Sequence, residues 1–321
     1  GKHMPADLHI RRGTPDDANA FCGLFNGLYR RKVDAGYYHW RFFSAPFPTD
    51  LWVATATDDG PIGFYGVHHF PASDGVCVVS FAVDIMVRPD HQRGGVFRGL
   101  VQAARDASQG SVICVMANDR ARDAHVHGDG WTHVGTPVTR TATARPYPAA
   151  EEYAVRRIER FADRHTRLWD GFVAAAPGVR AVRRDAAHLN WRFVHNPWYE
   201  YEAFEFARGA DTVGYLVAKS FRSPATGETS GDLVDMAWRR EDRDAPAAIL
   251  RHGLAHFHAR GVSEVNTWLE TNADIDHIAA SMGFRETGQS RQFCLRPLTS
   301  DAGDATDRSN WFLTMADAEI Y

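Results

Sequence analysis

The sequence has no long apolar run, although apolar residues are plentiful. No stretch approaches the roughly 18 consecutive apolar residues that a membrane-spanning helix needs, while 44% of the 321 residues are hydrophobic and 24% are charged. These proportions are typical of a globular protein with a water-exposed surface. The first residues also lack the basic-then-apolar pattern of a secretory signal. We therefore expect a cytoplasmic protein that does not bind membranes.

Cysteine is scarce. The four cysteines show no CxxC spacing and lie among apolar neighbours: Cys22, Cys77, Cys114 and Cys294. Disulfides and thiolate metal sites both need cysteines brought together in pairs or clusters. We therefore expect structural thiols, and neither a disulfide nor a metal site.

An excess of positive charge is also missing. The formal net charge at pH 7 is −4, so no global field attracts a polyanion such as DNA or RNA. We expect no nucleic-acid partner. A ligand that carries phosphate must therefore be held by local geometry.

An internal repeat sets the expected architecture. The tripeptide Trp-Arg-Phe begins at Trp40 and again at Trp191, an offset of 191 − 40 = 151. The same offset carries two further tripeptides onto similar ones without a gap: Ile62-Gly63-Phe64 onto Val213-Gly214-Tyr215, and Val83-Asp84-Ile85 onto Val234-Asp235-Met236. Later pairs continue at offsets of 153 to 154: Asn118 with Asn272, and Gly130-Trp131 with Gly283-Phe284. A period this long is a whole domain rather than a solenoid repeat.

The length and the repeat together predict two tandem domains. We expect an N-terminal domain over 5–147, a C-terminal domain over 150–297 and a tail over 298–321. A chain of this length is long for one compact domain and comfortable for two.

Hydrophobic periodicity predicts the same order of elements in both copies. In the first copy we expect a strand at 8–10, a helix over 16–31, strands over 51–57, 62–70 and 76–87, a helix over 96–107, a strand over 112–116 and a helix over 121–126. In the second copy we expect a strand over 153–161, a helix over 164–175, strands to about 238, a helix over 246–260 and a strand over 264–269. The fold class is thus α/β (α+β), with a mixed, mostly antiparallel sheet flanked by helices in each copy.

One strand-to-helix connection carries a glycine-bearing loop. The chain leaves a predicted strand at Val87, passes Pro89 and enters an amphipathic helix after Gly94-Gly95. Such a loop can present free backbone N–H groups and the positive end of a helix dipole to a pyrophosphate. A plain turn is the alternative reading of this segment alone.

The loop resembles that of the GNAT acetyltransferases, whose Gln/Arg-x-x-Gly-x-Gly/Ala motif matches Gln92-Arg93-Gly94-Gly95-Val96-Phe97. Phe97 departs from the small residue usual there, which leaves the acyl group open. The resemblance implies acyl-CoA as cosubstrate, acetyl or longer. It implies cofactor contacts at Val87, Gln92, Arg93, Gly94, Gly95, Val96, Phe97 and Asn118.

The segment from Asn118 to Gly130-Trp131 resembles the second signature of the same family, in which a tyrosine protonates the departing CoA thiolate. His125 stands at the tyrosine position, and an imidazole could do that work near neutral pH. The alternative is a surface histidine. For the base, the candidates are Asp84, His68 and His69; because neighbours on a strand point to opposite faces, only one of these two histidines can face a cleft.

The duplication also bears on these roles. Asp235 repeats Asp84, which favours a structural or interface role for this aspartate, and the repeated Trp-Arg-Phe predicts core aromatics with an arginine paired to a carboxylate. The second copy has Ala279 at the tyrosine position and Pro246 near the start of its helix, after Glu241, Asp242 and Asp244. Proline has no N–H to donate and the acids repel phosphate. We therefore expect only the first copy to bind CoA.

The function implied by the resemblance is transfer of an acetyl or longer acyl group from CoA to a small-molecule amine. A loose similarity to bacterial nucleotide-amino-sugar N-acyltransferases makes such a sugar one candidate acceptor. Two alternatives stay open: a non-catalytic acyl-CoA binding module, and an aminoacyl transferase of the peptidoglycan-bridge type. The sequence does not indicate the oligomeric state.

Overall fold

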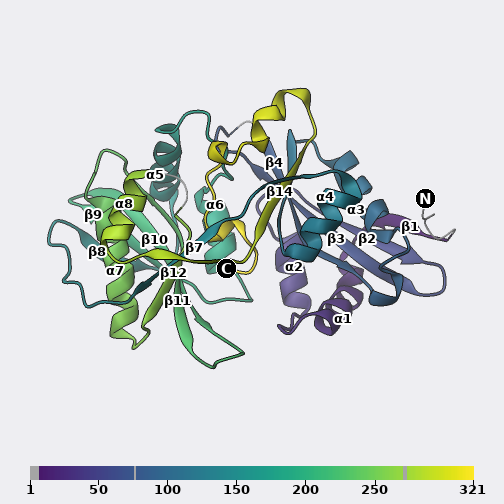
Figure 1. Ribbon diagram of the computed structural model, residues 1–321, viewed down its shortest axis with the longest axis horizontal. Coiled ribbons are helices and arrows are strands. Elements are labelled where there is room, and N and C mark those ends of the chain that lie inside the picture. Colours follow the sequence, from purple (N-terminus) through teal and green to yellow (C-terminus); the bar gives the residue numbers. More distant parts are fainter. Residues whose placement is uncertain (1–6, 76, 270–272) are drawn as a thin grey trace. The chain divides into compact units, whose positions relative to one another are not determined.

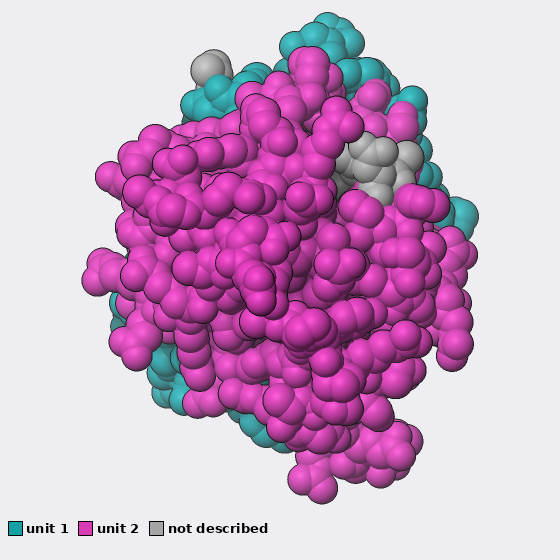
Figure 2. Space-filling model, turned by 90° about the vertical axis from the view of Figure 1, so that its left-hand side faces the viewer, with its two compact units in different colours: residues 1–135, 196–198, 292–307 teal, residues 136–195, 199–291, 308–321 magenta. Residues whose placement is uncertain are grey.

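A computed structural model describes residues 7–75, 77–269 and 273–321. The chain forms two compact units, which Figure 2 colours separately. Unit 1 comprises Gly1–Gly135, Asn196–Trp198 and Gln292–Asp307, and unit 2 comprises Thr136–His195, Tyr199–Arg291 and Arg308–Tyr321. Neither unit is a continuous stretch of chain.

Unit 1 is built on a seven-stranded sheet in the order β1-β2-β3-β4-β5-β14-β6 (Figure 1). Its strands are β1 (His9–Arg12), β2 (Thr49–Ala56), β3 (Gly60–Pro71), β4 (Val78–Val87), β5 (Val112–Ala117), β6 (Thr132–Gly135) and β14 (Gln292–Pro297). β4 and β5 pair in parallel, and the neighbouring pairs are antiparallel. Its helices are α1 (Ala18–Leu28), α2 (Ala35–Phe43), α3 (Val96–Ala107) and α4 (Asp119–Asp129).

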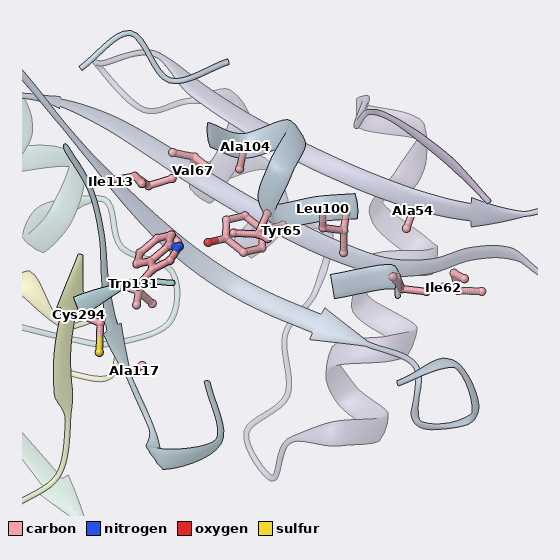
Figure 3. Packing of buried hydrophobic residues seen from close by; sticks show 14 of the residues in the cluster. Ala54, Ile62, Tyr65, Val67, Leu100, Ala104, Ile113, Ala117, Trp131 and Cys294 are labelled. Atoms are coloured by element: carbon pink, nitrogen blue, oxygen red, sulfur yellow. The ribbon is translucent and has the colours of Figure 1, made fainter. Parts of the chain in front are cut away.

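The sheet of unit 1 is covered on both faces. On one face, the buried side of α3 packs on apolar strand residues, which Figure 3 shows around Tyr65 and Leu100. On the other face, aromatic residues join α1 and α2 to β3, with the Phe21 ring 5.3 Å from Phe64 and 5.5 Å from Phe42. A helix with one apolar stripe and a sheet with two apolar faces bury one another in this way.

Unit 2 repeats the arrangement in the order β13-β7-β12-β11-β10-β9-β8. Its strands are β7 (Val138–Thr143), β8 (Ala154–Ile158), β9 (Glu202–Arg208), β10 (Asp211–Arg222), β11 (Thr229–Trp238), β12 (Glu264–Thr267) and β13 (Arg285–Gln289). Its helices are α5 (Asp163–Ala174), α6 (Ala186–Leu189), α7 (Ala245–Ala259) and α8 (Ala273–Ser281). The predicted fold class is confirmed.

The two copies exchange a strand. β7 follows the first copy along the chain but pairs with β12 and β13 in unit 2, whereas β14 follows the second copy and pairs with β5 and β6 in unit 1. The compact units therefore differ from the contiguous ranges 5–147 and 150–297 expected from the sequence.

The repeated glycines set how closely a helix approaches each sheet. A Cβ on Gly63 would lie 3.1 Å from side-chain atoms of Val96 and Leu100 on α3, and one on Gly214 would lie 2.9 Å from Ile249 on α7. A side chain at either position would force these neighbours to shift, so glycine favours this close approach of strand and helix. Helix α2, which carries the first Trp-Arg-Phe, was not predicted.

Candidate active site

The glycine loop links β4 to α3 in unit 1. After Val87 the chain makes a short 3₁₀ turn over Pro89–His91. Gly95 then stands at the N-cap position of α3 with a φ of 82°, in the left-handed region. A side chain with a Cβ is strained at such a φ. Glycine at 95 is therefore what allows the chain to turn sharply into the helix.

The first amides of α3 are open. The helix ladder begins with the Gly99 N–H donating to the Gly95 carbonyl at 3.2 Å, and no side chain caps this end. The N–H groups of Val96, Phe97 and Arg98 consequently have no intrahelical acceptor. Aligned helix amides of this kind bind anions, and phosphates in particular.

The loop is held by contacts to its own unit. The Gln92 side-chain amide donates to the Val87 carbonyl at 3.1 Å, and its oxygen accepts from Arg120 at the start of α4. Gln92, one of the predicted cofactor-binding residues, thus uses both ends of its amide to join β4, the loop and α4.

Arg88 neutralises the acidic residues beside the loop. It lies 3.1 Å from a carboxylate oxygen of Asp59 and 2.7 Å from one of Asp90, and His91 lies 3.0 Å from Asp59. Hydrogen bonds from Arg88 lower the pKa of both Asp59 and Asp90. The turn between β2 and β3, which holds Asp59, is thereby fastened to the loop.

Three exposed arginines belong to the loop or to the first turns of α3 and α4: Arg93, Arg98 and Arg120. Among the described residues, Arg93 and Arg98 have no ion pair, and the contact of Arg120 goes to the neutral Gln92 amide. Their charges favour a phosphorylated ligand. Arg93 was predicted from the motif; Arg98 and Arg120 were missed, because neither stands at a motif position.

The pairing of β4 with β5 ends before either strand does. They pair from Val79–Val112 to Ala82–Val115, and a bulge interrupts the pairing of β4 with β3 between Val83 and Met86. Within this bulge Asp84 has a φ of 51°, a positive value that no other non-glycine residue shares in the described part of the chain. Strained backbone of this kind is frequent at functional sites.

The Asp84 side chain is engaged inside the unit. It is buried, accepts a hydrogen bond from the Tyr37 hydroxyl at 2.9 Å and lies 3.3 Å from the Arg41 Nε. This confirms the predicted pairing of the first Trp-Arg-Phe arginine with a carboxylate. It favours the structural role of Asp84 over the role of base.

His125, the predicted acid, lies in the core. It has no exposed surface, its Nδ1–H donates to the Ala121 carbonyl at 2.6 Å, and its Nε2 accepts from the Tyr65 hydroxyl at 2.8 Å. Burial lowers the pKa of His125 to about 4. A neutral imidazole with both nitrogens engaged argues against proton transfer, and the alternative of a surface histidine is wrong as well.

His68 and His69 point to opposite faces, as predicted. His68 is buried beside Phe47 and donates from Nε2 to the Arg41 carbonyl at 2.9 Å. His69 lies between the Asp50 carboxylate and the Ser80 hydroxyl, each at 2.8 Å. Burial and the nearby Arg12 lower its pKa. Ser80, Asp50 and His69 occupy the start of β4 and its neighbours, away from the bulge.

Two further predicted cofactor-binding residues, Asn118 and Phe97, both contact α4, one as a cap and one by packing. Asn118 is exposed and caps α4 by accepting from the Ala121 N–H at 2.8 Å. The Phe97 ring packs 4.9 Å from His125, and a Cβ on Gly128 would lie 3.6 Å from it. The unusual Phe97 therefore fills space between α3 and α4.

Tyr29 is a titratable residue at the bulge that sequence reasoning missed. Its hydroxyl lies 3.5 Å from the Ile85 carbonyl, one residue after Asp84, and its side chain is 40% exposed. No motif marks it, because its position follows from where the end of α1 brings the chain beside Ile85.

Helix α7, the counterpart of α3, has no open amide cluster. The Ala245 N–H donates to the Asp242 carbonyl at 3.2 Å, Pro246 has no N–H, and Asp244 stands at the cap position. The predicted counterpart Asn272 lies outside the described residues. Ala279, at the tyrosine position, is buried.

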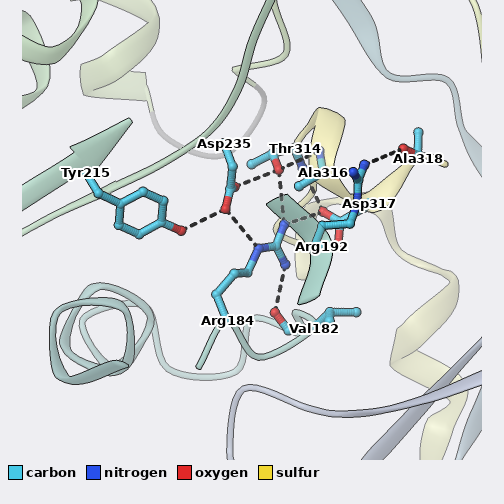
Figure 4. A network of polar contacts seen from close by, with 9 residues as sticks. All are labelled: Val182, Arg184, Arg192, Tyr215, Asp235, Thr314, Ala316, Asp317 and Ala318. Atoms are coloured by element: carbon cyan, nitrogen blue, oxygen red, sulfur yellow. Dashed lines mark hydrogen bonds and ion pairs between the residues drawn. The ribbon is translucent and has the colours of Figure 1, made fainter. Parts of the chain in front are cut away.

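Asp235 repeats the pattern of Asp84 with different partners (Figure 4). It accepts from the Tyr215 hydroxyl at 2.7 Å and the Thr314 hydroxyl at 2.9 Å, and the Arg184 Nε lies 3.4 Å away. The second Trp-Arg-Phe arginine, Arg192, instead donates to Tyr201 and to backbone carbonyls near the end of the chain. Unit 2 thus uses this position to anchor its own C-terminal segment.

Comparison with known proteins identifies the fold. No family model and no curated protein sequence matches the chain. Among solved structures, a tandem GNAT protein from the clavulanic acid biosynthesis pathway is similar with a TM-score of 0.60 and 13% identity, over 91% of this chain and 99% of that one. A GCN5-related N-acetyltransferase from Anabaena variabilis is similar with a TM-score of 0.68 and 10% identity, over 91% of this chain and 73% of that one. N-myristoyltransferase from Saccharomyces cerevisiae, with bound myristoyl-CoA, is similar with a TM-score of 0.60 and 9% identity, over 91% of this chain and 83% of that one.

These similarities establish a tandem GNAT fold, as the motifs predicted. Within the part of the chain that the structure describes, no helix is both long and apolar enough to cross a bilayer.

Proposed function

We propose that this protein transfers an acyl group from acyl-CoA to an amine, with the CoA bound at the start of α3 in unit 1. The observation that carries the proposal is the uncapped helix end behind Gly95, where open amides stand among unneutralised arginines. A diphosphate is the ligand that this arrangement suits best. Two of the similar solved structures are named as an N-acetyltransferase and an N-myristoyltransferase, and they support the assignment.

The residues present divide the work of holding acyl-CoA. The amides of Val96, Phe97 and Arg98 would bind the pyrophosphate, and Arg93, Arg98 and Arg120 would supply charge. The pantetheine arm would lie where β4 and β5 separate, because unpaired strand edges there can hydrogen-bond its amides. The exposed Asn118, at the end of β5, would contact the same arm.

Proton transfer is assigned to Tyr29 rather than to the buried histidines. Amine attack on a thioester forms the C–N bond and breaks the C–S bond; the ammonium loses a proton and the leaving thiolate gains one. Tyr29 presents a hydroxyl on the exposed side of the bulge. His69 and His125 have both ring nitrogens engaged inside the unit, and His68 is buried and donates from Nε2 to the Arg41 carbonyl.

For the acceptor, we propose a small-molecule amine, with nucleotide-linked amino sugars as the first class to test. A direct assay is release of free thiol from acetyl-CoA and longer acyl-CoAs in the presence of an amine panel. We expect amine-dependent release that is lost in Gly95→Asp. Thiol release that is equal in the wild type and in Gly95→Asp, or that no amine stimulates, would contradict an N-acyltransferase using this site.

The burial of four candidate acid and base residues favours a second function, a non-catalytic acyl-CoA binding module. Asp84, His68, His69 and His125 all lie away from solvent or in closed hydrogen-bond networks. Such a module would bind CoA at the same loop without turnover. Tight CoA binding together with no product from any amine in the panel would select this reading.

A further inference from the structure

Strand β14 comes from the second copy, yet it borders the helix that supports the glycine loop. Its first residue, Gln292, pairs with Ala117 at the end of β5, and the Gln292 amide donates to Asp119 at the start of α4 at 3.2 Å. The Asp119 side chain is 78% exposed, so this contact contributes little on its own.

The other end of β14 makes a stronger connection. Arg296 donates to the backbone carbonyl of Asp129, the last residue of α4, at 2.5 Å, and lies 3.3 Å from its carboxylate. The same carboxylate accepts from the Trp131 Nε1–H at 2.8 Å. Arg105, in the last turn of α3, lies 2.8 Å from it. The Asp129 side chain is only 7% exposed, so water screens its charge interactions with these partners poorly.

These contacts form a path from β14 to the loop. Arg296 fixes the end of α4 through Asp129, and Asp129 ties α4 to α3 through Arg105. At its other end, α4 reaches the loop through Arg120 and Gln92. Arg296 of the exchanged strand is therefore linked to both helices, to α4 directly and to α3 through the shared carboxylate of Asp129.

We propose that Arg296 is a positioning residue for the acyl-CoA site, so that the second copy, which lacks a glycine loop, sets the cofactor affinity of the first. This inference rests on the proposed function. Arg296 touches no reacting group; it acts by keeping α3 and α4 in register with the loop. Loss of Arg296 would therefore weaken CoA binding while leaving turnover at saturating acyl-CoA nearly unchanged.

The chain offers a closely matched control. Arg11 pairs with Asp17 at 2.7 Å, and the exposed fractions of the two side chains, 36% and 7%, equal those of Arg296 and Asp129. The Arg11 pair joins β1 to the turn before α1 and makes no contact with α3 or α4 among the described hydrogen bonds. Arg11→Ala and Arg296→Ala thus remove the same kind of ion pair from the same unit.

The test is titration of the full-length protein with coenzyme A, combined with amide hydrogen exchange over 88–98 and 119–129. For Arg296→Ala we expect Kd to rise on the order of tenfold and exchange in both segments to increase; Arg11→Ala should change neither, and Arg296→Lys should recover part of the affinity. Wild-type affinity and exchange in Arg296→Ala would overturn the inference and leave the proposed function standing. Equal losses in Arg11→Ala and Arg296→Ala would also overturn it, as a general stability effect. A wild type that does not bind coenzyme A overturns both.

Discussion

Single residues in unit 1 show how a repeated motif position takes a structural role. Asp84 combines a positive φ with a buried ion pair to Arg41. Removing one partner of a buried pair leaves an uncompensated charge, which costs about 3–5 kcal/mol.

We predict that Asp84→Asn lowers the free energy of unfolding by about 3 kcal/mol, because asparagine tolerates a positive φ but cannot balance Arg41. Denaturant unfolding and turnover should be measured on the same preparation. A variant with wild-type stability and greatly reduced kcat would show instead that Asp84 acts as the base.

The buried His125 should make the free energy of unfolding decrease as the pH is lowered. Because burial lowers its pKa from 6.5 to about 4, the unfolded chain binds a proton between these pH values that the folded chain does not. The contribution of His125 to the free energy of unfolding is therefore fully present above pH 6.5 and is lost as the pH falls towards 4. The loss reaches about 3 kcal/mol at about 1.4 kcal/mol per pKa unit.

In His125→Gln this acid-dependent loss should become shallower, since glutamine still accepts from Tyr65 but does not titrate. Urea midpoints at pH 7.5 and 5 measure the difference. Identical pH dependence in the wild type and the variant would mean that His125 is not the group responsible. The other histidines with lowered pKa values, such as His188 and His252, supply the remaining slope.

Tyr29 carries the proposed proton transfer, and Tyr29→Phe removes only its hydroxyl. Proton transfer by a positioned side chain contributes typically 10²–10⁴-fold. We expect kcat to fall by roughly 10²-fold, with little change in coenzyme A affinity. Steady-state kinetics together with titration decide this; unchanged kcat across the pH range would remove Tyr29 from the mechanism.

At the scale of elements, the same strand–helix contact occurs twice, and only one copy bears a glycine loop. Valine at Gly63 would push against α3, and valine at Gly214 against α7. Overpacking of this kind costs about 1–3 kcal/mol.

Gly63→Val should lower both stability and coenzyme A affinity, because displacing α3 moves the open amides. Gly214→Val should lower stability alone. Thermal unfolding and titration of the two variants give the comparison. Equal loss of affinity in both would contradict a site confined to unit 1.

Much of the element pattern could be predicted from sequence, and the reasons are physical. The apolar spacing of Val96, Leu100 and Ala104 defined α3 because one helix face is buried. The glycine loop was predictable because Gly95 is needed for its φ of 82°. The burial of His125 was not, because His125 is the one buried residue of α4 and the helix therefore shows little apolar periodicity.

The contacts of Arg120 and Arg296 were also beyond sequence reasoning. Each depends on a residue distant in the chain, Gln92 for Arg120 and Asp129 for Arg296. Exposed arginines leave no periodic pattern in the sequence, because a side chain that faces water does not have to recur at the spacing of a helix or a strand.

At the scale of the whole molecule, the strand exchange is the feature that the repeat concealed. No strand was predicted from the sequence over the residues of β7 or of β14, and a repeat does not tell which sheet a strand completes. The pairings place β14 in unit 1, where Phe293, Cys294 and Leu295 are fully buried. A division of the chain near residue 147 would leave both sheets incomplete.

We therefore predict that the fragment 4–147 does not fold on its own. It lacks the buried Phe293 and Leu295 of its sheet, and truncation of such a side chain costs about 2–5 kcal/mol, against a total stability of about 5–15 kcal/mol for a typical domain. Circular dichroism during denaturation should show no cooperative transition for this fragment, and co-expression with 148–321 should restore one. A soluble, cooperatively folding 4–147 that binds coenzyme A would mean that β14 is dispensable.

The central claim is that the chain holds one acyl-CoA, at the start of α3. Calorimetric titration of the full-length protein with acyl-CoA tests it most directly, with Gly95→Asp, Gly75→Asp and Pro246→Ala as variants. Gly75 is a matched control because it also has a positive φ, 72°, in a turn of the same unit; aspartate adds the same strain and charge at either place. We predict a stoichiometry of one for the wild type, Gly75→Asp and Pro246→Ala, and no binding for Gly95→Asp. A stoichiometry of two, or undiminished binding by Gly95→Asp, would contradict the account.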